Sequence, residues 1–156
     1  MACGEGLYEA GKRNELRVKD RINPTHDEIQ AWARTPGALY PMEDWDLVIA
    51  RDENAEVFYR LATDPSCVNR DAMLNLLYVW AGQTIRAGSN QASAALLRRL
   101  IALAAGGRDD DVRVWSNRAE RTLDGGGPDP RAGGSNEDYA FWFLGGWRHR
   151  REGSSS

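Results

Sequence analysis

A chain of 156 residues with a formal charge of −3 is an acidic protein of about one domain's length. Its 42% hydrophobic and 28% charged residues are ordinary globular usage, which predicts an ordered core with disorder confined to the ends. The negative charge argues against non-specific nucleic-acid binding, because a phosphate backbone requires a positive protein surface.

The cysteines and histidines are few and widely spaced. Cys3 and Cys67 are the only thiols, and no apolar secretory leader follows Met1, so we expect a reduced, cytoplasmic protein. With His26 and His149 they show none of the usual zinc spacings, and no pairing of a histidine with a nucleophile is suggested. We expect no metal, no cofactor and, since no apolar run reaches roughly 18–20 residues, no membrane span.

The N-terminal part predicts a polar arm followed by a first helix. Residues 1–23 are polar and interrupted by glycine, which is typical of a short helix or an extended arm. Thr25 and Glu28 form a capping-box pattern after Pro24, and predict a helix start. That helix carries Ile29, Trp32 and Ala33 on one face and ends near Thr35.

A second short helix is predicted from Pro41, a residue suited to a first helical turn. Acidic side chains are favourable near the positive end of a helix, and three of them follow: Glu43, Asp44 and Asp46. The apolar stripe of this helix consists of Trp45, Val48 and Ile49.

Two longer helices follow. Asn54 is predicted to cap a helix that carries Val57, Phe58 and Leu61 and ends at Asp64-Pro65. Residues 69–87 then show two apolar stripes, which predict a central helix contacted on two sides. These stripes are Met73, Leu76, Leu77 and Trp80, and Leu74, Tyr78, Ala81 and Ile85.

Gly88 is predicted to end that helix and Ser89 to begin the next, which ends at Gly106-Gly107. Inward-facing residues are expected to be Leu96, Leu97, Leu100, Ile101 and Leu103, with Arg98 and Arg99 facing water. Asp109, Asp110 and Asp111 are typical of a helix start more than of a Mg²⁺ site. The helix that they begin carries Val112, Trp115, Ala119 and Leu123, and this single apolar stripe predicts an outer, half-exposed position.

The remaining residues divide into three parts. Residues 124–135 are rich in Gly and Pro and predict a flexible linker between a helical domain over 1–123 and an aromatic helix over 136–148. Residues 149–156 predict a disordered tail. Trp142 and Trp147 belong either to a helix that seals an exposed face of the domain, or to an anchor for a partner or a membrane surface.

The stretch LLRRLIALAAGGRDDDVRVWSNRAERTL (residues 96–123) resembles a HEAT-type repeat, with an apolar helix, an acidic turn and Val-Arg opening the second helix. The helix pairs over 54–87 and 89–123 begin about 35 residues apart, although the first pair lacks the Asp-Val-Arg turn. The helical pattern predicts an all-α fold of about six helices, either in stacked antiparallel HEAT-like hairpins or in an irregular right-handed bundle. The resemblance implies a binding role.

The densest acidic group is Glu43, Asp44, Asp46, Asp52, Glu53 and Glu56. It is either a solvated helix face or a surface that binds another, basic protein; paired carboxylates also serve metals and acid–base catalysis. We therefore expect a non-catalytic protein-binding module, such as an immunity, antitoxin-like or adaptor protein. Two alternatives are an enzyme with Asp44, Asp46, Arg51 or Asp52 in a pocket, and a self-assembling protein that uses the segment Trp142–Trp147.

Overall fold

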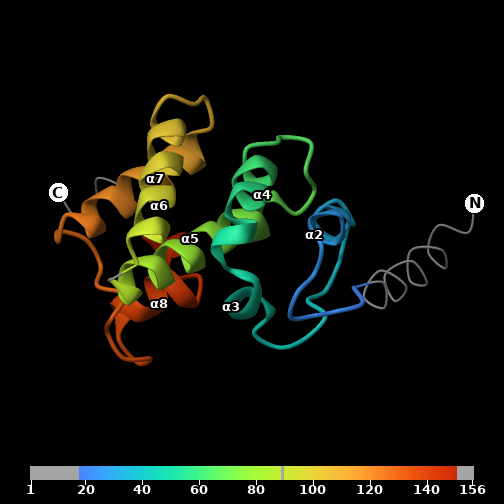
Figure 1. Ribbon diagram of the computed structural model, residues 1–156, viewed down its shortest axis with the longest axis horizontal. Coiled ribbons are helices and arrows are strands. Elements are labelled where there is room, and N and C mark those ends of the chain that lie inside the picture. The colour runs from blue at the N-terminus through green and yellow to red at the C-terminus, as the bar shows by residue number, and fades with distance from the viewer. Residues whose placement is uncertain (1–17, 89, 151–156) are drawn as a thin grey trace, which may run out of the picture. The chain divides into compact units, whose positions relative to one another are not determined.

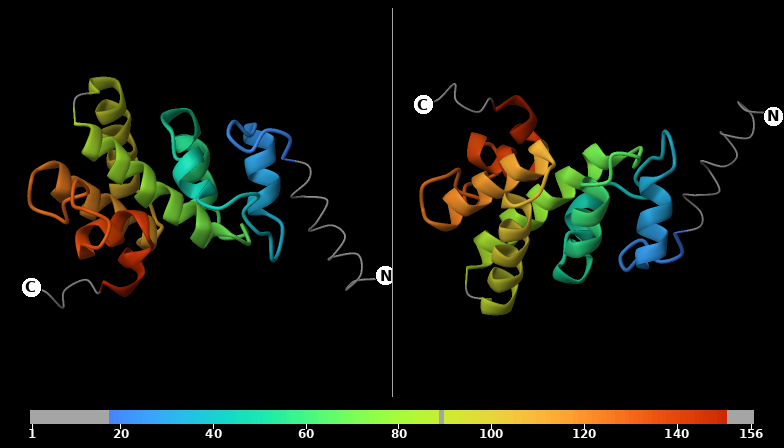
Figure 2. Two further views of the ribbon diagram at one scale, coloured as in Figure 1. Left: turned by 90° about the horizontal axis from the view of Figure 1, so that it is seen from below. Right: turned by 90° about the horizontal axis from the view of Figure 1, so that it is seen from above.

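The computed structural model describes residues 18–88 and 90–150. Within these ranges the chain forms seven α-helices and one 3-10 helix and no strand, so the predicted all-α class is confirmed (Figures 1 and 2). The helices are α2 (His26–Ala33), α3 (Trp45–Ile49), α4 (Asp52–Ala62), α5 (Arg70–Ala87), α6 (Gln91–Ala105), α7 (Asp110–Leu123), α8 (Glu137–Phe143) and the 3-10 helix η1 (Gly146–His149). Stacking as repeated hairpins stays a prediction.

The chain divides into two compact units, residues 1–76 and 77–156, and the boundary lies inside α5. This division differs from the expected one, which placed the end of a helical domain at residue 123. The two units differ in charge: the first carries 14 acidic and nine basic residues (−5), and the second nine acidic and 11 basic residues (+2). Cys3, most of the predicted arm, Ser89 and the tail from residue 151 lie outside the described residues.

The predicted capping box of α2 is confirmed. The Glu28 backbone N–H donates to Thr25 Oγ1 (3.1 Å), and the Thr25 N–H donates to Glu28 Oε1 (2.8 Å). This reciprocal pair satisfies donors that a helix start otherwise leaves unpaired. The predicted inner face, Ile29, Trp32 and Ala33, is buried, and α2 packs against α4.

Two predicted helix starts are wrong. The helix expected from Pro41 begins at Trp45, because residues 41–44 form a turn in which Asp44 is left-handed (φ 60°). Glu43 and Asp44 therefore precede this helix. The next helix begins at Asp52, so Asn54 lies inside its first turn and is buried, and its amide donates to the Ile49 carbonyl (2.9 Å).

Three aromatic rings form the centre of the first unit. The ring centroids of Trp32, Tyr40 and Trp45 lie 5.4–5.6 Å apart. Each indole also donates its N–H to a loop carbonyl, Trp32 to Leu39 and Trp45 to Arg21, both at 2.8 Å. The indoles thus tie two loops to the helical core, because buried Trp N–H groups need an acceptor.

The helix α5 has the burial that its two apolar stripes predicted. Every residue from 73 to 82 is buried, although Ile85, at the end of one stripe, is only partly so. The helix ends before Gly88, which has φ +72°, a conformation that glycine adopts without steric cost.

In the second unit, α6 and α7 pack against each other (Figure 1). Asn90 caps α6, and Asp109 caps α7 by accepting from the Val112 N–H (3.0 Å). One predicted inward residue is wrong: Leu103 is 51% exposed. The apolar buried face of α6 is Leu97, Leu100, Ile101 and Ala104, and Leu103 lies beside this face, four residues after the exposed Arg99.

The Gly/Pro segment 124–135 makes specific contacts, although it was predicted as a flexible linker. The Trp142 indole donates to the Pro128 carbonyl (2.9 Å), and the Asp129 N–H donates to Asp138 Oδ2 (3.1 Å). Pro130 is buried. The segment is therefore fastened to α8.

Candidate interaction surface

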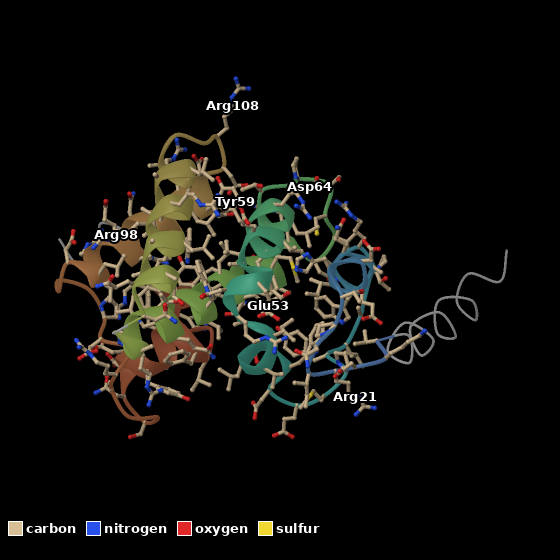
Figure 3. The ribbon with its side chains drawn as sticks, in the orientation of Figure 1. Arg21, Glu53, Tyr59, Asp64, Arg98 and Arg108 are labelled. Carbon is tan, nitrogen blue, oxygen red and sulfur yellow. The ribbon has the colours of Figure 1, made fainter. Side chains whose placement is uncertain are left out.

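The acidic residues singled out from the sequence remain mostly at the surface. Glu43, Asp44, Asp52, Glu53 and Glu56 are exposed, and we call these five the α3–α4 acidic surface. Two of them precede α3 and three lie on the outer face of α4, whose opposite face is buried in the first unit. Figure 3 shows Glu53 near the start of α4.

Asp44 is the only non-glycine residue with positive φ among the described residues (φ 60°, ψ 24°). Left-handed backbone disfavours most side chains, but Asp and Asn tolerate it well. The side chain makes no capping hydrogen bond to α3 and is exposed. The turn therefore presents this carboxylate outward, just before the helix.

Asp46 differs from the other carboxylates because it is half-buried. Its Oδ1 accepts from the Leu47 N–H (3.0 Å), and its Oδ2 accepts from the Asn75 amide (3.4 Å). Burial raises the pKa of the Asp46 carboxyl, and the nearby charge of Asp44 adds to this shift, although these hydrogen bonds oppose it. Asp46 is thus bound within the first unit and is not part of the exposed surface.

The residues proposed for a catalytic pocket do not act as one group. Arg51 Nη2 donates to the Ile22 carbonyl (2.9 Å) and lies 3.5 Å from Glu53. It therefore fastens the N-terminal segment, while Asp52 is exposed on α4. Asp44 lies close enough to Asp46 for its charge to raise the pKa of the Asp46 carboxyl.

The two C-terminal tryptophans are buried in the second unit. Trp142 is 0% exposed and Trp147 8%, and the Trp147 ring stacks on Tyr78 at 4.4 Å with an angle of 2° between the rings. In this conformation neither ring is available to a partner. Their placement agrees with a sealing helix, so we leave both out of the candidate surface.

Sequence reasoning missed Arg118, which is 5% exposed on α7. Its guanidinium donates to Tyr78 Oη (2.8 Å) and to the carbonyls of Trp147 (3.3 Å) and Arg150 (2.7 Å), and lies 5.3 Å from the Phe141 ring centroid. The sequence signal for this burial is that Arg118 lies beside Trp115 and Ala119 on the apolar stripe of α7. Such a position requires partners for the buried charge.

In the described part of the chain no group of three or more His, Cys, Asp or Glu side chains is placed to hold a metal ion. No helix in that part combines the length and apolar character needed to cross a membrane. Comparison with protein-family models, curated proteins and solved structures finds no match for this chain.

Proposed function

We propose that this protein is a non-catalytic, cytoplasmic binding module that uses the α3–α4 acidic surface to hold a basic protein partner. A concrete form of the proposal is an immunity, antitoxin-like or adaptor protein that masks one partner. The observation that carries it is the exposure of five carboxylates, two in the turn before α3 and three on α4, in a unit whose charge is −5.

Charge of one sign on a surface accelerates encounter with a partner of the opposite sign, and it suppresses binding to wrong partners. The backbone fixes the positions from which these carboxylates project. Asp44 lies in a left-handed turn, and Asp52 and Glu53 lie in the first turn of α4. Acidic residues outnumber basic ones in this segment, since Arg51 and Arg60 are the only basic residues between positions 43 and 62.

The proposal is tested by affinity capture from the native host with the full chain as bait, at low and at high salt. We expect one stoichiometric protein with a basic surface, retained at low salt and weakened at high salt, because the Debye length falls from about 10 Å at 0.1 M to about 3 Å at 1 M. Recovery of no stoichiometric protein, or of one whose binding is indifferent to salt, contradicts the proposal.

A further inference from the structure

The second unit carries a basic and apolar surface where α8 meets η1. Arg86, at the end of α5, and Arg148 and Arg150, in and after η1, are all exposed. Leu144, which follows α8, is 64% exposed and places an aliphatic side chain beside these arginines. We call these four residues the α8–η1 corner.

Each arginine of the corner is placed by an aromatic ring beneath it. The Arg86 guanidinium lies 5.9 Å from the Phe143 ring centroid, that of Arg148 4.6 Å from Trp147, and that of Arg150 5.1 Å from Phe141. These separations are in the range of cation–π contacts. The rings belong to the buried core, so the charged groups have a rigid base.

The turn between α8 and η1 brings an arginine close to Leu144. Gly145, the next residue, has φ +74°, and an ideal Cβ at this position would lie 2.5 Å from Arg148 Nη1. The Arg148 guanidinium therefore lies against the turn that presents Leu144. A charged group and an exposed aliphatic group are thus neighbours at one corner.

The part of the chain that forms α8 and η1 carries few acidic residues. The sequence contains no Asp or Glu from Tyr139 to Arg151, and Glu137 and Asp138 lie in the first turn of α8, at the opposite end of the helix from Leu144. The basic groups of the corner belong to the unit with a charge of +2. This segment is therefore locally basic although the whole chain is acidic.

We propose that the α8–η1 corner docks the protein on an anionic phospholipid bilayer. Arginine binds phosphate groups through paired donors, and a surface-bound protein inserts aliphatic side chains at the boundary of head groups and acyl chains. The exposed Leu144 favours a bilayer over a nucleic acid, because a phosphate backbone gives an aliphatic side chain nothing to bury into. This surface lies in the other unit from the α3–α4 acidic surface, so the two proposals are independent.

The test is sedimentation of the full chain with vesicles of phosphatidylcholine alone, or of equal parts phosphatidylcholine and phosphatidylglycerol. We expect binding only to the anionic vesicles. The double variant Arg148→Gln/Arg150→Gln keeps the Arg150 carbonyl that Arg118 uses, and should weaken binding by roughly five-fold for each arginine. Leu144→Ser should also weaken binding while leaving its salt dependence unchanged, since it removes no charge.

The matched control is Arg98→Gln/Arg108→Gln, which removes the same charge from exposed positions in α6 and the α6–α7 loop (Figure 3). This variant should bind the anionic vesicles as the wild type does, and circular dichroism checks that all variants are folded. The proposal is overturned if the anionic vesicles do not retain the wild type at low salt, or if the control weakens binding as much as the corner variant. It is also overturned if the corner arginines retain a DNA duplex and not the vesicles.

Discussion

Arg118 shows how a single buried charge organises the C-terminal part of the second unit. Its donors reach a side-chain oxygen on α5 and two main-chain carbonyls that lie 29 and 32 residues further along the chain. Because two of these acceptors are backbone atoms, the residue fixes the path of the C-terminal segment whatever side chains that segment carries. Loss of Arg118 would leave buried acceptors without donors.

We predict that Arg118→Met lowers the free energy of unfolding by about 2–4 kcal/mol, because hydrogen bonds to a charged group are lost and their partners stay buried. Urea denaturation measures this change, and near-UV circular dichroism should report the loss of the Tyr78–Trp147 stack. Arg121→Met is the matched control, since Arg121 lies one turn later on α7 and is exposed; we expect it to change stability by less than about 0.5 kcal/mol. Equal effects of the two substitutions would show that Arg118 is not a structural centre.

Asp64 gives a pH dependence with a definite sign. Hydrogen bonds from Ser66 and Arg34 lower the pKa of this carboxyl to about 2, below its unfolded value of about 3.9. The ionised form is therefore favoured in the folded state, and its contribution is present above about pH 4 and lost as the pH falls toward 2.

We predict that Asp64→Asn melts at a lower temperature than the wild type at pH 7 and low salt, and that this difference shrinks below pH 4 and is lost as the pH falls through about 2. Thermal unfolding followed by circular dichroism across this range makes the comparison. A difference that stayed constant with pH would mean that the ionised carboxylate contributes nothing to stability.

Asp46 contributes a pH dependence of stability with the opposite sign to that of Asp64. Its pKa is raised chiefly by burial, so the fold favours the protonated form and stability is lost as the pH rises above the unfolded value. Asp46→Asn removes this cost and keeps one oxygen, which accepts from the stronger donor, the Leu47 N–H, while the longer contact with the Asn75 amide is lost. We expect the variant to melt above the wild type at pH 7 and at the same temperature at pH 3, where both states of the wild type are largely protonated. A variant that melted below the wild type at pH 7 would contradict the assignment.

At the scale of elements, close packing of helices depends on glycine. Gly82 lies in the buried part of α5, and a Cβ there would come 2.8 Å from Trp142 Cβ and 3.1 Å from the Phe143 ring. Alanine normally favours a helix interior over glycine by about 1 kcal/mol, but this contact leaves no room for a methyl group. The absence of a side chain lets α8 approach α5.

We predict that Gly82→Ala lowers the free energy of unfolding by about 1–3 kcal/mol, as overpacking typically does. Gly106→Ala serves as the control, because Gly106 has φ −91° and nothing comes nearer to its Cβ position than 4.0 Å. It should leave stability unchanged or raise it by up to about 1 kcal/mol. Chemical denaturation separates the two, and a stabilising Gly82→Ala would show that α8 does not pack as described.

The positions of helices could be predicted where a single local sequence pattern allowed only one interpretation. The two stripes of α5 and the capping pair of α2 specify their elements within a few residues of sequence, and both were predicted. The start of α3 was not, because Pro41 suits a helix start as well as a turn. The left-handed conformation of Asp44, in a turn beside the packed ring of Trp45, makes the difference.

The candidate surface was predictable only in part, where a local sequence pattern determined which side chains are exposed. Carboxylates on the polar side of an amphipathic pattern stay exposed, so Glu53 and Glu56 could be placed from sequence. The burial of Asp46 beside Asn75 joins residues 29 positions apart and has no local signal. The same is true of Arg118, whose acceptors are backbone atoms that a sequence does not distinguish.

For the molecule as a whole, the division of charge is the property with the widest consequence. A unit of −5 and a unit of +2 give one chain surfaces of opposite sign. We assign the negative one to a basic protein and the basic corner of the positive one to an anionic bilayer. Substitutions in one surface should therefore leave binding at the other unchanged.

The most direct measurement of the central claim is the affinity of the captured partner for two charge variants of the full chain. The first is Glu43→Gln/Asp44→Asn/Glu53→Gln, in which Asn keeps the left-handed turn acceptable. The second removes equal charge from exposed positions of the other unit, Glu120→Gln/Asp124→Asn/Glu137→Gln. The account predicts that only the first loses affinity, by at least about ten-fold, chiefly through slower association at low salt. Equal affinity of both variants would contradict it.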